Sequence, residues 1–421
     1  MQTQFSASLL SSEVGREADA ILRRCVHCGF CNATCPTYQL TGDELDGPRG
    51  RIYLIKRLFE NQGNNQQKNQ EDGVATLLHL DRCLTCRNCE TTCPSGVEYG
   101  RLLDIGREQI EQQVSRPLVD KIFRWGLSSF LSQPARFRVG LNTARLFQFL
   151  LPTFLRNALP TQSSSLSSRA AWPEAQHSRR VILRQGCVQQ VIDPGINAAT
   201  AKVLDMCSIS VVRVKGEACC GALDQHLTQT EKAEQFMRRN IDAWWPHIEQ
   251  GVEAIVCTAS ACGVQVKDYG HYLRRDDLYA KKARRISAIT RDISEILSQE
   301  EALPEQRVKK ENKVRVAFHA PCTLQHGLGL GGVVEGILRR WGFETLPVSD
   351  SHLCCGSAGT YSILNPELAE PLRINKLAAL QASQPDIIAS ANIGCLQHLK
   401  KGAAVPVRHW IELLADCQRA Q

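Results

Sequence analysis

The sequence predicts an α+β protein of several domains, with a helical N-terminal domain followed by two small α/β domains. Two cysteine runs separated by helical apolar stripes lie in the first part of the chain. A pattern of strands and helices occurs twice in the last 240 or so residues, between positions 181 and 421. A basic, apolar stretch and a Ser-rich segment lie between these two parts. We therefore expect domains over residues 1–113, 181–305 and 306–421, with a connector over 114–180.

The two cysteine runs have the same spacing. Each reads Cys-x-x-Cys-x-x-Cys-x-x-x-Cys-Pro, and together they comprise Cys25, Cys28, Cys31, Cys35 and Cys83, Cys86, Cys89, Cys93. Thiolates at every third residue can surround one face of an iron–sulfur cubane, and the fourth cysteine of such a run ligates the other cluster in two-cluster ferredoxins. Zinc is the alternative, but zinc sites usually take four ligands in two separated pairs. The spacing therefore predicts two [4Fe–4S] clusters.

The expected ligand sets exchange one cysteine between the runs. The first cluster would be held by Cys25, Cys28, Cys31 and Cys93, and the second by Cys83, Cys86, Cys89 and Cys35. Helical spacing at residues 1–24, 51–58 and 99–113 predicts a ferredoxin domain whose loops are separated by helices. We expect the Asn- and Gln-rich residues 61–72 to form a solvated loop.

Residues 116–159 interleave large apolar side chains with seven basic ones, and Asp120 is their only acid. Such a stretch can lie in a membrane interface, or it can form connector helices packed on the protein itself. The Ser-rich residues 161–168 predict a flexible linker.

The C-terminal repeat is defined by cysteine spacing. In each copy 31 residues separate a first cysteine from a Cys-Cys-Gly sequence, and a last cysteine follows after a further 41 or 39 residues. Predicted strands over 181–183, 210–214 and 254–256 correspond to strands over 314–318, 343–348 and 387–388. Two β-α-β units of this kind predict two parallel sheets related by a pseudo-twofold axis.

Each repeated cysteine falls at or after a predicted strand end, the edge of an open α/β sheet where ligands bind. The two sets are Cys187, Cys219, Cys220, Cys262 and Cys322, Cys354, Cys355, Cys395. Each set could hold a further cluster or form a thiol pocket. His226, His319, His326 and His352 lie nearby in sequence and could move a proton or ligate a metal. Cys207, Cys257 and Cys417 lie outside the pattern and are read as structural cysteines.

Composition excludes several classes of protein. The chain has 421 residues, 43% of them hydrophobic and 22% charged, with 19 cysteines and a formal charge of +7. Cysteines grouped as metal ligands in a chain of this length indicate a reducing compartment rather than a disulfide scaffold. Five arginines lie beside the cysteine runs, where cations offset cluster charge: Arg23, Arg24, Arg82, Arg87 and Arg101. No nucleic-acid-binding motif is present, so nucleic acid is not an expected partner. No apolar run is long enough for a membrane span, and we expect a cytoplasmic protein.

The whole arrangement resembles the iron–sulfur subunits of membrane-associated dehydrogenases, in particular those of bacterial glycolate oxidases. The resemblance rests on the two cysteine runs, on both Cys-Cys-Gly sequences, and on stretches such as Asn240-Ile-Asp-Ala-Trp-Trp-Pro246 and Pro321-Cys-Thr-Leu-Gln-His326. Heterodisulfide reductases, which are related, carry five cysteines in each Cys-Cys-Gly domain. Here each half has four, because Ala259 and Asn392 occupy the position three residues before the last cysteine.

The resemblance implies an electron-transfer subunit with no catalytic residue of its own. It implies a partner subunit that carries FAD and oxidises glycolate to glyoxylate, a second flavoprotein-like subunit, and the quinone pool as acceptor. It also implies peripheral contact with the cytoplasmic face of the inner membrane. Lactate or glycerol 3-phosphate could replace glycolate, and the chain could instead be a heterodisulfide-reductase-type thiol–disulfide enzyme or a non-catalytic scaffold.

Overall fold

The structure is a computed structural model that describes residues 1–61, 66–149, 159–160, 172–174, 176–300 and 313–417. Packing divides the chain into two units. The first comprises Met1–Arg124 with His352–Lys376, and the second comprises Trp125–Ser351 with Leu377–Gln421. Each unit is described by itself below. The predicted α+β class is confirmed, because helices surround the cysteine runs and two parallel four-stranded sheets follow.

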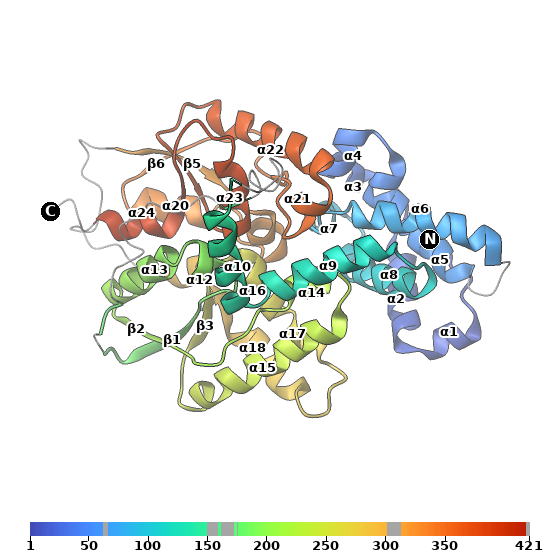
Figure 1. Cartoon of the computed structure of the whole chain (residues 1–421), viewed down its shortest axis with the longest axis horizontal. Coiled ribbons are helices and arrows are strands. Elements are labelled where there is room, and N and C mark those ends of the chain that lie inside the picture. Colours follow the sequence, from blue (N-terminus) through green and yellow to red (C-terminus); the bar gives the residue numbers. More distant parts are fainter. Residues whose placement is uncertain (62–65, 150–158, 161–171, 175, 301–312, 418–421) are drawn as a thin grey trace. The chain divides into compact units, whose positions relative to one another are not determined.

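The N-terminal unit is helical around both cysteine runs (Figure 1). Its core is built from apolar side chains of α2, α5 and α8, among them Leu22, Ile55 and Leu102, each fully buried. A tight helix contact explains the glycine at position 106, since a Cβ there would lie 2.7 Å from an Ile55 side-chain atom. The elements are α1 (Ala7–Ser11), α2 (Glu13–Arg24), α3 (Phe30–Ala33), α4 (Pro36–Thr41), η1 (Glu44–Asp46), α5 (Pro48–Glu60), α6 (Gln66–Asp81), α7 (Asn88–Thr92) and α8 (Tyr99–Gln113).

One prediction in this unit is wrong. The segment over 61–72 was expected to be a loop, but α6 begins at Gln66 and continues to Asp81, directly before the second cysteine run. Gln, Lys and Glu are good helix formers, so this polar segment extends the helix that the apolar residues of its second half anchor. Residues 62–65 lie outside the described part of the chain.

The first repeat forms a parallel sheet with the strand order β2-β1-β3-β4. Three strands were predicted, and the short fourth strand was missed. Buried apolar residues of β1, β3 and α15, including Ile182, Ile255 and Trp244, form the core on one face of the sheet. The elements are β1 (Arg179–Arg184), α12 (Gln189–Ile192), α13 (Gly195–Met206), β2 (Ile209–Val212), α14 (Ala222–His226), α15 (Thr230–Glu249), β3 (Ala254–Cys257), α16 (Ser260–Lys267), α17 (Tyr269–Tyr272), α18 (Ala280–Ile289), β4 (Thr290–Asp292) and α19 (Ile293–Leu297).

The second repeat has the equivalent order, β6-β5-β7-β8, again with an unpredicted fourth strand. All six strand pairings in the two sheets are parallel. The predicted pair of α/β repeats is therefore present. The elements are β5 (Arg315–His319), the π-helical turn η5 (Thr323–Gly327), α20 (Val333–Arg340), β6 (Glu344–Leu346), α21 (Tyr361–Leu364), α22 (Pro366–Gln381), β7 (Ile387–Ser390), α23 (Ile393–Lys400), β8 (Val407–His409) and α24 (Trp410–Asp416).

The two sheets pack as equivalent halves inside the C-terminal unit. Helix α13 of one half packs against α24 of the other. The imidazole Nε2 of His409 lies 2.9 Å from the Thr258 carbonyl oxygen, and the Ser260 amide donates to the Ala391 carbonyl at 3.2 Å. The first link joins the end of β8 to the loop that follows β3, and the second joins the segments that follow β3 and β7, which lead to the last cysteine of each repeat.

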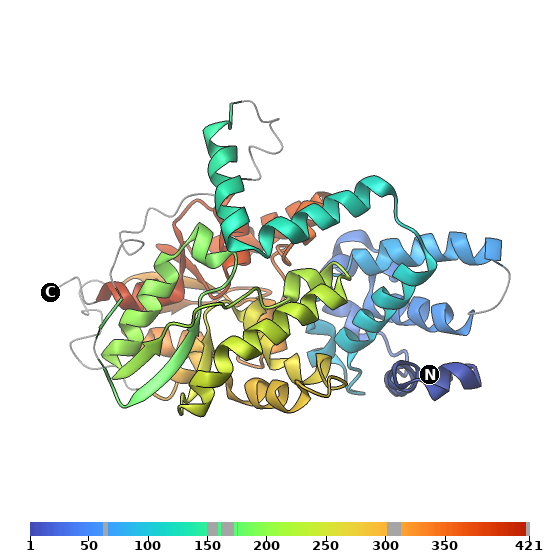
Figure 2. The ribbon, with the colours of Figure 1, turned by 60° about the horizontal axis from the view of Figure 1, so that its bottom comes forward.

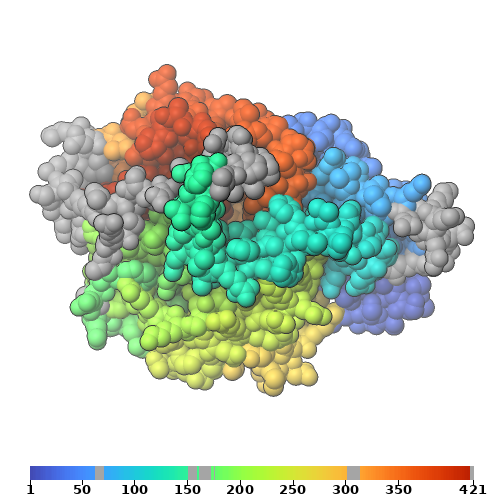
Figure 3. All heavy atoms as spheres, viewed as in Figure 1, coloured from blue at the N-terminus to red at the C-terminus, as the bar shows by residue number. Residues whose placement is uncertain are grey.

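Two helices occupy the predicted connector, α9 (Leu118–Leu131) and α10 (Pro134–Leu146). Figure 2 shows α10 standing out from the C-terminal unit, and in Figure 3 its atoms lie on the visible face. No helix in the described ranges is long and apolar enough to cross a membrane. The Ser-rich linker over 161–168 lies outside the described residues.

Candidate functional site: two ferredoxin pockets and a thiol cluster

A first pocket lies at the first cysteine run, and we call it the outer pocket. Its cavity of about 430 Å³ is lined by Cys25, Cys28 and Cys31 from the first run and by Cys93 from the second. Cys28 is exposed to solvent. The apolar side chains flanking it in sequence, Val26 and Phe30, are 66% and 62% exposed.

A second pocket of about 300 Å³, the inner pocket, is lined by Cys83, Cys86 and Cys89 of the second run and by Cys35 of the first. Three of these four cysteines are buried, and Cys86 is half-buried. Both cavities are also lined by Pro48, Cys89 and Tyr99, so the two pockets share a wall.

The two runs fold alike because the same positions take left-handed backbone conformations. The residues before and after the second cysteine have positive φ in both runs: 55° at His27 and 83° at Gly29, and 54° at Thr85 and 59° at Arg87. Positive φ reverses the chain sharply at these points, which lets three sulfurs face one cavity. The cysteine spacing predicted the two loops, but it does not predict that these four residues adopt positive φ.

Burial raises the pKa of Cys31 in the outer pocket and of Cys89 in the inner pocket. The pKa of Cys31 is raised to about 11 by burial and by its neighbours Cys25 and Cys28. Burial also raises the pKa of Cys89, and the adjacent cysteines of the second run add to this effect. Binding of a metal would therefore expel protons, because thiolates are the ligands. The donor set of four cysteines per pocket fits a [4Fe–4S] cluster.

A buried guanidinium lies against the inner pocket. Arg51 is 1% exposed and lines the cavity. Its Nε donates to the His79 carbonyl at 2.7 Å, and its terminal nitrogens lie 3.2 Å from Thr37 Oγ1. Asp46 is its nearest carboxylate, at 3.6 Å. The sequence places Arg51 in a predicted helix but gives no indication that it faces the cysteines.

The four cysteines of the first repeat lie together in the C-terminal unit. Cys187 Sγ is 3.4 Å from Cys219 Sγ, and Cys220 Sγ is 3.5 Å from Cys262 Sγ. All four are free thiols. The Cys-Cys-Gly sequence turns at Gly221, where φ is 91°.

The walls of this thiol cluster are polar and buried. Asn240 accepts from the Ala218 amide at 2.7 Å and donates to the Cys219 carbonyl at 2.8 Å, which fixes the loop that carries the paired cysteines. The Arg184 guanidinium is 2% exposed. The pKa of Cys220 is held well below its usual range because its sulfur is hydrogen-bonded with the Cys219 and Cys262 thiols and Arg184 adds positive charge.

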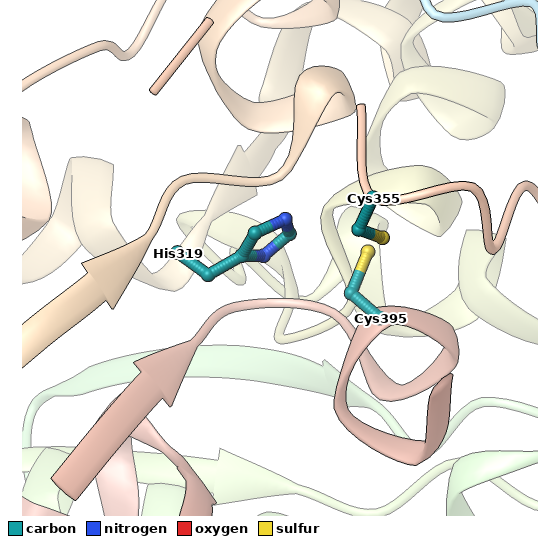
Figure 4. Close-up of side chains that lie close together, drawn as sticks. All are labelled: His319, Cys355 and Cys395. Atoms are coloured by element: carbon teal, nitrogen blue, oxygen red, sulfur yellow. The ribbon is translucent and has the colours of Figure 1, made fainter. Parts of the chain in front are cut away.

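The cysteines of the second repeat are divided between the two units. Cys322 and Cys395 belong to the C-terminal unit, and Cys354 and Cys355 belong to the N-terminal unit. In the C-terminal unit an imidazole nitrogen of His319 lies within 4.8 Å of Cys395 Sγ. Figure 4 shows His319 at the end of β5 and Cys395 on the first turn of α23, which follows β7, and Cys355 is labelled in the same view.

The residue three positions before the first cysteine differs between the two repeats. Arg184 and His319 each precede the first cysteine of their repeat by three residues. The imidazole Nδ1 of His319 lies 2.9 Å from Ser390 Oγ, which fixes the orientation of the ring. Of the four histidines singled out above, His319 is placed beside a cysteine by the structure. His226 lies on α14 and His326 on η5.

The loop that carries Cys354 and Cys355 packs on the cysteine runs inside the N-terminal unit. The Asn88 side-chain amide donates to the carbonyls of Thr34 and His352, both at 3.0 Å. The Tyr361 hydroxyl donates to the Arg82 carbonyl at 3.2 Å. Neither Asn88 nor Tyr361 was singled out from the sequence, because their partners are hundreds of residues away in the chain.

These features define a class of protein, an iron–sulfur dicluster ferredoxin joined to a duplicated cysteine-rich domain. The family model for a 4Fe-4S dicluster domain matches residues 21–97, and the model for a cysteine-rich domain matches residues 181–267 and 316–400. The chain belongs to the family of glycolate oxidase iron–sulfur subunits, which confirms the resemblance found in the sequence.

Three relatives show how sequence identity and coverage vary among similar proteins. The glycolate oxidase iron–sulfur subunit of Escherichia coli is 51% identical over 414 residues, which is 98% of each chain. The probable glycolate oxidase iron–sulfur subunit of Bacillus subtilis is 28% identical over 96% of this chain and 94% of its own. Lactate utilization protein A of Bacillus licheniformis is 24% identical over 54% of this chain and 95% of its own.

Proposed function

We propose that the chain is the electron-transfer subunit of a complex that oxidises glycolate to glyoxylate. A partner subunit carrying FAD would oxidise the substrate, a second flavoprotein-like subunit would complete the complex, and the quinone pool would receive the electrons. A bound [4Fe–4S] cluster supplies one-electron redox chemistry, which lets a flavin's electron pair leave one electron at a time.

One observation carries the proposal: each ferredoxin pocket is lined by three cysteines of one run and the last cysteine of the other. This arrangement supports ligation of one cluster by Cys25, Cys28, Cys31 and Cys93, and of the other by Cys83, Cys86, Cys89 and Cys35. The shared wall supports a short path between the two clusters.

The test is reduction of the purified complex by substrate. Glycolate added anaerobically should produce the EPR signals of reduced clusters, whereas lactate and glycerol 3-phosphate should produce them more slowly. If lactate reduces the clusters faster than glycolate, the substrate assignment is wrong while the electron-transfer role stands. If no 2-hydroxy acid reduces clusters that dithionite does reduce, the role itself is wrong.

We also propose a further cluster in the first repeat, held by Cys187, Cys219, Cys220 and Cys262. The support is that four free thiols, three of them buried, lie beside a buried Arg184 that favours negative charge. By the repeat, Cys322, Cys354, Cys355 and Cys395 would form the corresponding set in the second half.

Replacing Cys219 and Cys220 with alanine in the full chain tests this cluster. The iron and sulfide content per chain should fall while the signals of the ferredoxin clusters remain. The matched control is Cys207→Ala, which removes a cysteine outside the pattern and should leave the iron content unchanged. Equal iron in both variants would eliminate a cluster at this site.

A thiol–disulfide activity is the second candidate, and one observation favours it. Cys220 has a low pKa and lies between Cys219 and Cys262, as a nucleophilic thiolate with a resolving partner would. Reduction of a heterodisulfide by the full-length protein, lost in Cys220→Ser together with unchanged iron content, would support this activity over a cluster.

The protein would act at the cytoplasmic face of the inner membrane as a peripheral subunit. The support is the exposed apolar and basic surface of α10, where Val139 and Leu146 are 67% and 69% exposed and Arg136 and Arg138 are also exposed.

A further inference from the structure

The two ferredoxin pockets differ in how they are exposed to water. In the outer pocket Cys28 is open to solvent. Two cations at this pocket are also partly exposed: Arg49, which lines the pocket at 37% exposure, is paired with Glu44, and the N-terminal ammonium donates to the Cys25 carbonyl at 2.5 Å. Charges in contact with water are strongly screened, so they change the energy of a nearby cluster little.

The inner pocket has a cation that water does not reach. Arg51 is 1% exposed, while the carboxylate closest to it, Asp46, is fully buried and is shared. Asp46 also accepts from His79 Nδ1 at 2.8 Å and pairs with Arg82 at 3.1 Å. One carboxylate therefore faces two permanent cations, and the charge of Arg51 is not cancelled.

A second buried guanidinium and several polar hydrogens reinforce this field. Arg107 is 6% exposed and donates to the Cys83 carbonyl at 2.9 Å. The Tyr99 hydroxyl lies 3.6 Å from Cys83 Sγ, and the Thr85 amide donates to the same sulfur at 3.5 Å. In the outer pocket Cys31 Sγ faces an acceptor, Asn32 Oδ1, at 3.9 Å, which offers no hydrogen to a thiolate, while the His27 backbone hydrogen-bonds to the Cys25 thiol.

Reduction adds one negative charge to a cluster whose four thiolates already make it an anion. Net charge, hydrogen bonds to sulfur and solvent exposure set the reduction potential of such a cluster. A buried cation and donors at sulfur stabilise the added electron, and they do so more strongly where the local dielectric is low. Both differences favour the inner pocket.

We propose that Arg51 raises the reduction potential of a cluster held in the inner pocket above that of a cluster held in the outer pocket. The electron of the ferredoxin unit would then reside mainly in the inner pocket. An electron on a cluster held by Cys25, Cys28, Cys31 and Cys93 would pass to a cluster held by Cys83, Cys86, Cys89 and Cys35, the first losing and the second gaining one electron. No bond forms or breaks and no proton moves. Arg51 is thus a positioning residue, which acts through the cluster and touches no substrate. This inference rests on the proposed ligand sets.

The test is an EPR-monitored redox titration of the full chain loaded with iron and sulfide. In the wild type the inner cluster should be reduced at the higher potential; a Cys86→Ser variant assigns its signal. Arg51→Met should lower the potential of that signal alone and shift the equilibrium between the two clusters by at least about tenfold. Arg51→Lys, which keeps the charge, should restore most of the wild-type value.

Two further variants serve as controls in case the Arg51→Met protein does not fold. Arg49→Met removes the exposed cation of the outer pocket and should leave the inner potential unchanged. Tyr99→Phe removes a single oxygen at Cys83 and should lower the inner potential by less than Arg51→Met does. Reduction of the outer cluster first in the wild type, or an unshifted inner potential in both Arg51→Met and Tyr99→Phe, overturns the inference.

The outcomes also separate this inference from the proposed function. Loss of one or both cluster signals from the loaded wild-type protein would contradict the two-cluster assignment itself. Two clusters that are both reduced by substrate, but in the opposite order, would contradict only the role of Arg51.

Discussion

Cys93 belongs to the second cysteine run but lines the outer pocket with Cys25, Cys28 and Cys31. We therefore expect Cys93→Ser to weaken the same cluster as Cys28→Ser, because each removes one of the four sulfurs of the proposed outer ligand set. Low-temperature EPR of the two variants should show loss or distortion of the same signal.

Cys86→Ser provides the comparison for this experiment, since Cys86 lines the inner pocket. A Cys93→Ser spectrum that matched that of Cys86→Ser would mean that each run keeps its own four cysteines, and the exchanged ligand sets would be wrong.

Asp292 and His409 occupy equivalent positions in the two repeats, each capping the helix that follows the fourth strand. Burial raises the pKa of Asp292 to about 6 from 3.8, and burial lowers the pKa of His409 to about 4 from 6.5. The protonated carboxyl and the neutral imidazole are therefore the forms that the fold favours.

The two groups make opposite contributions to pH-dependent stability. The contribution of Asp292 is fully present below pH 3.8 and is lost as the pH rises through about 6. That of His409 is fully present above pH 6.5 and is lost as the pH falls through about 4. Each shift corresponds to about 3 kcal/mol.

Asparagine at either position keeps a capping acceptor and removes the titration. Asp292→Asn should abolish the loss of stability between pH 4 and 6, and His409→Asn should abolish the loss on acidification below pH 6.5. The measurement is the thermal midpoint against pH, followed by tryptophan fluorescence. A variant whose profile stays parallel to the wild type would show that its group does not titrate on unfolding.

At the scale of elements, α9 and α10 bear on the two hypotheses for residues 116–159, namely connector helices packed on the protein and a segment that lies in a membrane interface. Two of its seven basic residues are used internally, because Arg116 and Arg124 both pair with Asp81, at 2.6 and 2.8 Å. This end of the stretch is therefore packed on the protein, as a connector would be. Arg136 and Arg138 of α10 are exposed and can meet an anionic surface.

Reversing both charges on α10, Arg136→Glu with Arg138→Glu, should lower co-flotation with anionic liposomes by at least about tenfold. Each cation near such a surface contributes about 1 kcal/mol, and the reversal adds repulsion. The matched control reverses two exposed cations of α18, Lys281 and Arg285. Equal flotation of the two double variants would mean that α10 does not bind membrane.

The sequence predicted elements well where spacing or apolar periodicity was strong. The closing helix α8 has the predicted bounds, Tyr99–Gln113, because its apolar positions recur at helical spacing. The strands β4 and β8 were missed because each has three residues, too few to show a period. The Asn- and Gln-rich composition around the start of α6 indicated a loop, but the helix propensity of its Gln, Lys and Glu residues is sufficient for a helix from Gln66.

At the scale of the whole molecule, sequence repeats and packing divide the chain differently. The spacing predicted four converging cysteines in the first repeat, where the structure places Cys187 beside Cys219 and Cys220 beside Cys262. It also assigned residues 352–376 to the second repeat, whereas packing groups them with the cysteine runs. Hydrogen bonds from Asn88 and Tyr361 explain this grouping, and contacts between such distant residues leave no periodic signal in a sequence.

Charge buried beside a site was equally hard to foresee. Arg51 and Arg184 look like any basic residue at a helix or strand position, and only the fold reveals that both are almost fully buried beside cysteines. Cysteine spacing predicts where a cluster can bind, whereas the surrounding field depends on which distant side chains pack there.

The exposure of Cys28 sets how the protein must be handled. A thiolate open to solvent leaves its iron accessible to oxygen, while three of the four inner cysteines are buried. Purification in air should therefore strip the outer cluster first, and the preparation should pass through a half-loaded state that retains the inner signal. A time course of iron content and EPR after exposure to air would show this order; simultaneous decay of both signals would mean that oxygen enters by another route. Samples prepared aerobically would then keep the inner cluster but lack the outer cluster that passes electrons to it.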